Sequence, residues 1–505
     1  MKTTRRQFIT QAGSAVAVAA IAGGPGLRAA VAPAADELCF KSARELLRLL
    51  GERKVSAREL MSAHLAQIAR VNPKINAIVA KLDDAECLAL AERADRQLAR
   101  RERVGPLHGL PFAHKDTEPA VGFPFTSGTP IFRTRMPTAD SAAVERIRAA
   151  GALSIGKTNV PEFAMGSHTY NPVYGPTRNP YDLTKSAGGS SGGAGAALAT
   201  GMLPLANGSD LGGSLRNPGN FNNVVGYRPT AGLVSLAPTA TPFGTMVTKG
   251  PLARSVADAA LLLSVMAGAD DRDPGGYPSD PAQFLRPLER DLKGVRVAWC
   301  PDLGGLPLDP RVRAVLAAQR ATFERMGCIV EDAAPNLDGA DEAFLTLRAW
   351  RTFHNLGPLL AQHRAVMKPE AIGEIEAGAK VTATQIARSL EVQAQVIQRM
   401  IAFQRTYEFV LCAVNQVPPF DVTLAWPKEI AGVKMVGYTD WMKSAYRITV
   451  TSCPAVSVPA GFTPEGLPVG IQIVGRYRGD FELLRVAHMF EQATRVGATR
   501  PAIAG

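Results

Sequence analysis

The chain has 505 residues, of which 46% are hydrophobic and 20% are charged, a composition typical of a folded globular protein with a large core. The formal net charge is +11, but Lys and Arg are not gathered into blocks, so the pattern argues against a nucleic-acid-binding protein. Six cysteines form no C-x-x-C pair and seven histidines form no H-E-x-x-H motif. We therefore predict no metal site and no cofactor, and we expect most cysteines to be buried thiols.

Residues 1–35 have the layout of an export signal. Arg5 and Arg6 lie in TTRRQFIT, an apolar stretch follows from about Ala12 to Ala20, and small residues come next in LRAAVAPAA. Paired arginines are typical of the twin-arginine route. The apolar stretch is shorter than the roughly 20 residues that span a bilayer. We predict cleavage between Ala30 and Ala35, no stable membrane insertion afterwards, and a periplasmic or secreted protein.

Residues 36–505 are predicted to form one large domain, because no linker or internal repeat interrupts them. Apolar periodicity predicts amphipathic helices at Ala43–Leu50, Ala57–Arg70 and Ala85–Arg101. Later in the chain, short β-type runs alternate with helical segments. The β-type runs are Leu153–Ile155, Val295–Trp299 and Ala455–Val458, and the helical segments are Ser141–Ala150 and Arg311–Met326. This alternation predicts an α/β fold with a mixed, mainly parallel twisted sheet flanked by helices. The mostly helical stretch 342–405 is expected to be an insertion or a cap over the site.

Two glycine-serine segments, GGSSGGAG at 188–195 and SDLGGSLR at 209–216, contain too little apolar area to be core elements. Glycine permits close backbone approach, so we expect N–H groups and the hydroxyls of Ser190 and Ser214 to face a reacting group. Upstream, Lys115 follows an apolar run in GLPFAHKD. That position fits a side chain that points inward from the end of a strand.

With Lys115, Ser190 and Ser214 in these motifs, the chain resembles the amidase-signature family of serine hydrolases. Most of the chain after about residue 38 takes part in the resemblance. Matching segments elsewhere are ARELMSAHLAQIARVNPKINAIVA (57–80), GPLHGLPFAHKD (105–116), GALSIGKTNVPEF (151–163), RNPYD (178–182), GYRPTAG (226–232), GPLARSVADAA (250–260) and CPAVSVPAGF (453–462).

The resemblance implies that Lys115 is the base, that Ser214 is the nucleophile, and that Ser190 relays the proton between them. It also implies that the relay serine, Ser190, is held by a cis peptide bond. A serine hydroxyl needs a base within hydrogen-bond reach when it attacks. Lysine can serve as that base if it is neutral, and burial lowers the pKa of an ammonium group.

Attack on an amide carbonyl produces an oxyanion, which preorganised backbone donors stabilise. Consecutive glycines allow neighbouring N–H groups to turn toward one point, so we assign the oxyanion hole to the backbone of Leu211, Gly212, Gly213 and Ser214.

Three further residues are expected to support this loop. Asp210 and Arg216 flank it with opposite charges and are predicted to clamp it. Ser191 is expected to hydrogen-bond in the catalytic network, as its family counterpart does.

Residues 151–158, GALSIGKT, match the phosphate-binding pattern G-x-x-x-x-G-K-[ST] letter for letter. A phosphate loop needs irregular backbone between its glycines, whereas ALSI reads as a strand. Pro161, shortly after, also restricts the backbone that precedes it. We therefore predict that this segment does not bind ATP.

Residues 188–192 also fit the G-x-S-x-G elbow of α/β-hydrolases, which leaves an esterase that uses Ser190 as an alternative. That interpretation requires a downstream histidine, and His354, His363 and His488 are the candidates. It leaves Lys115 and the DLGGS segment without a role.

We predict an amidase that hydrolyses a linear carboxamide, with a small-molecule aryl or alkyl amide as substrate and ester or carbamate cleavage as side activities. A homodimer is left open. Alternative functions are an amidotransferase A-type subunit that works with a partner, which the leader argues against, and a binding protein without catalysis, which the intact triad argues against. Eight residues are equally candidates for the acyl pocket or for ordinary core: Phe123, Phe125, Phe163, Met165, His168, Tyr170, Trp426 and Trp441.

Overall fold

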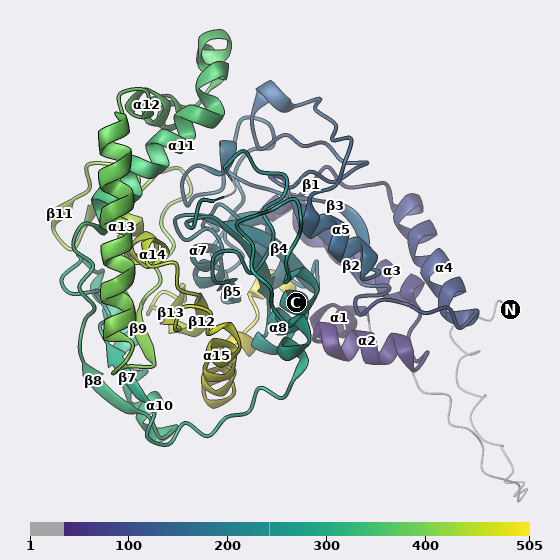
Figure 1. Cartoon of the computed structure of the whole chain (residues 1–505). Helices are drawn as coiled ribbons and strands as arrows, with labels where there is room; N and C mark the ends of the chain where they lie inside the picture. Colours follow the sequence, from purple (N-terminus) through teal and green to yellow (C-terminus); the bar gives the residue numbers. More distant parts are fainter. Residues whose placement is uncertain (1–34, 242) are drawn as a thin grey trace, which may run out of the picture. The chain divides into compact units, whose positions relative to one another are not determined.

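The computed structural model of the protein describes residues 35–241 and 243–505, and the predicted leader up to residue 34 lies outside them. Four helices open the described part of the chain (Figure 1): α1 (Ala35–Phe40), α2 (Ala43–Gly51), α3 (Ala57–Ile75) and α4 (Asp84–Ala99). α3 and α4 each begin with a capping box, formed by Ser56 with Glu59 and by Asp83 with Glu86. These boxes satisfy N–H groups that a helix start leaves unpaired.

A three-stranded sheet carries the first of the predicted site residues. It contains β1 (Ile78–Val79), β2 (Pro111–Lys115) and β3 (Leu153–Thr158) in the order β1-β3-β2. β2 and β3 run parallel, and the helix between them is α5 (Ala142–Ala149). β3 includes the LSIGKT of the phosphate-loop pattern, so that segment is a strand, as predicted.

The second sheet has eight strands in the order β4-β6-β5-β12-β13-β9-β7-β8. Its strands are β4 (Leu205–Asp210), β5 (Val225–Arg228), β6 (Thr248–Ala253), β7 (Arg296–Trp299), β8 (Ile329–Asp332), β9 (Phe409–Ala413), β12 (Ala455–Phe462) and β13 (Pro468–Val474). A separate two-stranded ribbon pairs β10 (Glu429–Ile430) with β11 (Val433–Lys434).

The sheet is mixed, as predicted, but it is not mainly parallel. Every neighbouring pair from β4 through to β9 is antiparallel, and β7 pairs in parallel with β9 and with β8. A parallel crossover needs a dozen or more connecting residues. β12 and β13 are instead joined by the short turn 463–467, which requires them to pair antiparallel.

Helices pack on both faces of this sheet. They are α6 (Gly192–Ala199), α7 (Arg216–Phe221), α8 (Val256–Met266), α9 (Pro310–Ala317), α10 (Arg320–Arg325), α14 (Lys443–Val450) and α15 (Asp480–Thr494). α9 and α10 together replace the single helix predicted over Arg311–Met326.

The interior strand β9 shows why two helical layers are needed. Phe409, Leu411 and Ala413 belong to one buried cluster, whereas Val410 and Cys412 belong to another. Successive side chains of a strand point to opposite faces, so this wholly apolar strand must be covered on both sides. All six cysteines of the chain are buried, as expected.

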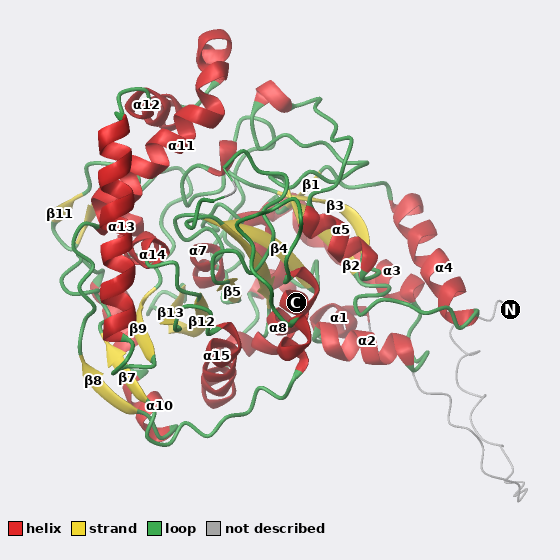
Figure 2. Cartoon of the chain, viewed as in Figure 1, coloured by secondary structure: helices red, strands yellow, loops and turns green. Residues whose placement is uncertain are grey.

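Three helices follow β8: α11 (Ala340–His363), α12 (Pro369–Gly378) and α13 (Ala383–Phe403). Figure 2 shows the three helices as one group, with α12 and α11 at the top of the view and α13 running down toward β9. The buried face of α11 includes Phe344, which stacks on Tyr446 of α14 with ring centroids 4.2 Å apart. None of the helices among the described residues combines the length and the apolar character needed to cross a membrane.

Candidate active site

Lys115 is the last residue of β2, and its side chain is fully buried. Its backbone N–H donates to Asn207 Oδ1 of β4 at 3.1 Å, which ties the two sheets together. The Nζ atom lies 2.8 Å from Ser190 Oγ and 3.0 Å from Ser209 Oγ. The structure therefore brings Lys115 and Ser190 together, and it adds Ser209, which sequence reasoning missed.

Burial lowers the pKa of Lys115 to about 7, because an ammonium group loses its hydration in the interior. The carboxylates of Glu118 and Asp210 act in the opposite direction, since nearby negative charge favours the ammonium form. A substantial fraction of Lys115 is thus neutral near pH 7.

The peptide bond between Gly189 and Ser190 is cis. Ser190 is almost completely buried, and the next residue, Ser191, donates its backbone N–H to the carbonyl oxygen of Ser214 at 3.2 Å. The two glycine-serine segments are therefore in direct contact. The Ser191 hydroxyl has no hydrogen-bond partner among the described residues, so its expected side-chain role in the network is not found.

The loop that carries Ser214 turns around the carboxylate of Asp210. The N–H of Gly213 donates to Asp210 Oδ1 at 2.9 Å, and the N–H of Leu215 donates to Oδ2 at 3.1 Å. Gly213 has a φ of 108°, and a Cβ atom there would lie 2.6 Å from the Ala445 side chain, so the turn requires glycine.

This arrangement reduces the number of N–H groups that can serve in the predicted oxyanion hole. The N–H of Gly213 is engaged by Asp210, whereas those of Leu211, Gly212 and Ser214 have no partner among the described residues. Three of the four predicted donors are thus available to a ligand. Ser214 itself is 8% exposed, and its hydroxyl makes no hydrogen bond within the described part of the chain.

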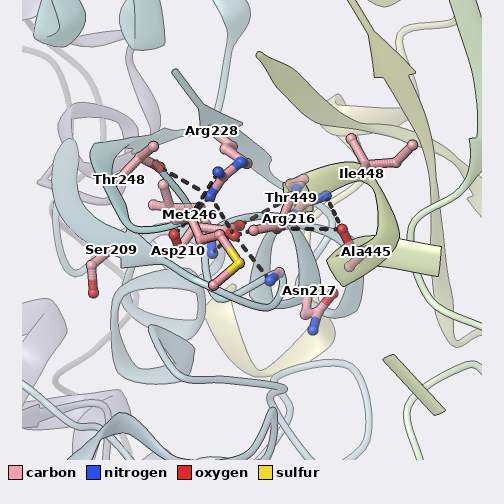
Figure 3. Close-up of polar contacts among 12 residues, drawn as sticks. Ser209, Asp210, Arg216, Asn217, Arg228, Met246, Thr248, Ala445, Ile448 and Thr449 are labelled. Carbon is pink, nitrogen blue, oxygen red and sulfur yellow. Dashed lines mark hydrogen bonds and ion pairs between the residues drawn. The ribbon is translucent and has the colours of Figure 1, made fainter. Parts of the chain in front are cut away.

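Asp210 lies between two arginines (Figure 3). Arg216 contacts both carboxylate oxygens, at 2.9 and 3.1 Å, and Arg228 Nη1 lies 3.2 Å from Oδ1. All three side chains are fully buried. Burial alone would raise the pKa of Asp210, but the two guanidinium groups outweigh it and hold that pKa well below its usual range.

The spacing of Asp210 and Arg216 on one loop made their ion pair predictable. Arg228 lies on β5 and reaches Asp210 because of the sheet order, and nothing local marks it. Arg216 also donates to the Ala445 carbonyl at 2.8 Å, and thereby joins the Ser214 loop to α14.

A second buried group of charges lies near Lys115. Lys249 Nζ is 2.9 Å from Glu118 Oε2, and Lys157 Nζ is 3.9 Å from Asp116 Oδ1 and donates to the Glu118 carbonyl. Lys157 is the lysine of the phosphate-loop pattern. Because Lys157 is fully buried on β3, its amine contacts groups of the protein itself in place of a phosphate.

The predicted catalytic serines border a cavity of about 560 Å³. Of the eight residues considered for an acyl pocket, Phe125, Phe163 and Met165 line it. Further apolar lining was not foreseen: Phe132, Leu236, Val247, Phe344, Leu356, Leu359 and Met442.

The other five pocket candidates, Phe123, His168, Tyr170, Trp426 and Trp441, lie away from the cavity lining. Trp441 is 1% exposed and packs between Phe221 and Phe420 in the core. His168 is also buried and is hydrogen-bonded to the Val422 carbonyl at 2.9 Å.

The contacts of Ser190 bear on the esterase alternative. Its hydroxyl is bonded to Lys115, and none of His354, His363 and His488 contacts it in the described structure. His488 instead lies 3.6 Å from Glu491. Among the described residues, no group of three or more His, Cys, Asp or Glu side chains is arranged to hold a metal ion.

Several known proteins are similar to this chain over most of its length. A model of the family "Amidase" matches residues 59–484. An acylamidase of Rhodococcus erythropolis is 35% identical over 470 residues, which cover 92% of this chain and 98% of the relative. The A-type subunit of the glutamyl-tRNA(Gln) amidotransferase from Cupriavidus necator is 34% identical over 500 residues, which cover 91% of this chain and 98% of that relative. A crystal structure of a bacterial aryl acylamidase of the amidase-signature family has a TM-score of 0.85 at 27% identity, with 92% of this chain and 99% of that chain covered.

Proposed function

This chain belongs to the amidase family and is an amidase, and we propose that Lys115, Ser190 and Ser214 hydrolyse a linear carboxamide to a carboxylate and ammonia or an amine. The observation that carries the assignment of roles is the 2.8 Å contact between a buried Lys115 amine and the Ser190 hydroxyl. An amine with a pKa of about 7 is neutral often enough at physiological pH to accept a proton.

In the first half of the reaction, the Ser214 oxygen bonds to the carbonyl carbon. The Ser214 proton passes to Ser190, and the Ser190 proton passes to Lys115, which becomes an ammonium. The carbonyl oxygen becomes an oxyanion, for which the N–H groups of Leu211, Gly212 and Ser214 are the donors. Such donors are each worth about 10²–10³ in rate.

In the second half, the carbon–nitrogen bond breaks while Ser190 protonates the leaving nitrogen and regains a proton from Lys115. Water then attacks the acyl group on Ser214 and delivers its proton through the same relay. Ser214 regains its proton through the relay, and the product leaves as the carboxylic acid, which loses its remaining proton to solvent and becomes the carboxylate.

Asp210 and Arg216 are positioning residues in this scheme, because the Asp210 carboxylate holds the N–H groups of Gly213 and Leu215 on either side of the nucleophile. Ser191 contributes its backbone contact to Ser214. We propose an aryl or alkyl amide as substrate, supported by the apolar lining of the cavity and by the likeness to acylamidases.

Labelling with a fluorophosphonate tests the assignment directly, because the probe bonds to an activated serine oxygen. We expect the wild-type protein to be labelled and the Ser214→Ala variant to remain unlabelled. An amide panel, primary against N-substituted and aryl against alkyl, then identifies the substrate. Labelling that persists in Ser214→Ala and disappears in Ser190→Ala would instead support the esterase alternative.

An amidotransferase A-type subunit is the second candidate, favoured by the 34% identity to the relative from Cupriavidus necator. An amidotransferase component would need a partner and would depend on glutamine. Purification of the protein from its own cells and an assay with glutamine distinguish the two functions. Glutamine-dependent ammonia release that requires a copurifying partner would favour the amidotransferase.

We also propose that the protein is exported by the twin-arginine route and works in the periplasm or the medium. The support is the sequence pattern of Arg5 and Arg6 ahead of an apolar stretch. Replacement of both arginines by lysine should retain the protein in the cytoplasm in a cell-fractionation experiment. Unchanged export would contradict the proposal.

A further inference from the structure

One face of α11 forms a wall of the cavity. Phe344, Arg348, Arg351, Asn355 and Leu359 all line it, and they follow one another at intervals of three or four residues. This is the spacing that places side chains on one side of a helix. α11 therefore turns two arginines toward the space in front of the catalytic serines.

The charged residues of the cavity wall are mostly positive. The cations are Arg135, Lys249, Arg348 and Arg351, and the one acid among the described lining residues is Glu118. Two of the cations are neutralised inside the protein. Lys249 lies 2.9 Å from Glu118, and Arg348 lies 2.7 Å from Glu374 of α12.

Arg351 has no such partner. Among the described residues, its guanidinium group makes no hydrogen bond and no ion pair, although its side chain is partly buried. Burial lowers the pKa of Arg351, because its charge loses part of its hydration there. A partly buried charge without a counter-ion is unfavourable, and a ligand carboxylate would relieve that cost.

Arg135, at the exposed edge of the cavity, adds to the positive field. Its guanidinium carbon lies 4.6 Å from the ring centroid of Phe125 and 4.9 Å from that of Phe132. These contacts hold the charge beside the cavity without neutralising it. A cavity with surplus charge of one sign raises the local concentration of oppositely charged ligands.

We propose that the amide substrate carries a carboxylate remote from its scissile bond, and that Arg351 binds this carboxylate. The planar guanidinium group presents paired N–H donors that match the two oxygens of a carboxylate. The apolar lining, with Phe163 and Phe344, suits an aryl or alkyl spacer between the carboxylate and the amide. This inference rests on the proposed function, since it defines the substrate class of the same site.

The test compares three anilides with the full-length enzyme: hexananilide, which is neutral; adipic acid monoanilide, which has a carboxylate on the acyl side; and 4-hexanamidobenzoate, which has one on the amine side. We expect kcat/KM for at least one carboxylated anilide to exceed that of hexananilide about tenfold or more. Arg351→Met should abolish this preference, and Arg351→Lys should restore part of it. The ratio of two substrates is used so that a general loss of activity cancels.

The matched control is Arg388→Met. Arg388 is on the neighbouring helix α13, is exposed, pairs with Glu342 at 3.0 Å, and does not line the cavity. This variant should keep the wild-type ratio. If Arg351→Met also keeps it, or if no carboxylated anilide is preferred, the inference is wrong even though amide hydrolysis stands.

A binding measurement separates the two proposals. Calorimetry with the Ser214→Ala variant should show tighter binding of the preferred carboxylated anilide than of hexananilide, and Arg351→Met in the same background should remove the difference. A wild-type protein that is not labelled by the fluorophosphonate at Ser214 would refute the proposed chemistry alone, and equal binding of charged and neutral anilides would refute the role of Arg351 alone.

Discussion

The pH dependence of amide hydrolysis gives the sharpest test of the neutral-lysine mechanism. The perturbation is a change of pH from 8 to 6 across the pKa of Lys115, which burial lowers to about 7. The neutral amine is the form that accepts a proton, and it is the form present above the pKa. Activity should therefore rise with pH.

The size of the effect follows from that pKa. About 90% of Lys115 is neutral at pH 8 and about 10% at pH 6. We expect kcat/KM to fall close to tenfold over this range. The fall on the acid side of the pH profile, called the acid limb below, should follow the titration of a single proton. Lys115→Ala should cost about 10²–10⁴ in kcat/KM and should remove the limb from any residual activity.

The assay is release of aniline from a neutral anilide, measured at constant ionic strength between pH 5.5 and 9. Lys249→Met provides a contrast within the same cavity. Loss of Lys249 removes the cation that pairs with the Glu118 carboxylate and leaves that carboxylate with the Ser141 hydroxyl as a hydrogen-bond donor, and Glu118 raises the pKa of Lys115. The acid limb should thus persist in this variant but move toward higher pH.

Three outcomes would refute the reasoning. They are a flat profile down to pH 5.5, near-normal activity of Lys115→Ala, and a limb of Lys249→Met that moves toward lower pH. The first two would show that Lys115 is not the base, and the third would show that Glu118 does not control its charge.

The remaining predictions concern the nucleophile, its support and metal ions. Ser214→Ala should abolish turnover while thermal unfolding stays within a few degrees of wild type; measurable turnover would exclude Ser214 as the nucleophile. Asp210→Asn leaves Arg216 and Arg228 buried without a counter-ion, so it should lower the free energy of unfolding by about 3–5 kcal/mol in urea titrations; a change below about 1 kcal/mol would contradict the clamp. EDTA should leave kcat unchanged, because the proposed chemistry uses an amine and hydroxyls, and EDTA-sensitive activity that returns with added metal would reopen the question of a metal.

Much of the local structure could be predicted from the sequence. The apolar periodicity of Ala57–Arg70 predicted the helix that is α3 in the structure. The apolar run inside GALSIGKT predicted a strand in place of a phosphate loop, and that strand is β3. Both depend on neighbours within a few residues, where side-chain direction repeats regularly.

Such local patterns could not predict whether neighbouring strands pair parallel or antiparallel. Alternation of strands and helices favoured a mainly parallel sheet, yet β12 and β13 pair antiparallel across a short turn. The wall of the cavity was also only partly foreseen. Phe163 was a candidate that lines it, whereas Trp441 was a candidate that lies in the core.

The sequence by itself determined the family resemblance and the three residues of the expected triad, because motifs of fixed spacing carry that information within single segments. Only the tertiary structure decided that Ser209 contacts Lys115, that Arg228 completes the charge balance of Asp210, and that Arg351 faces the cavity without a partner among the described residues. Each of these three features depends on segments that the folded chain brings together from different elements. Their energies come from burial and charge, which no stretch of sequence displays before the chain is folded.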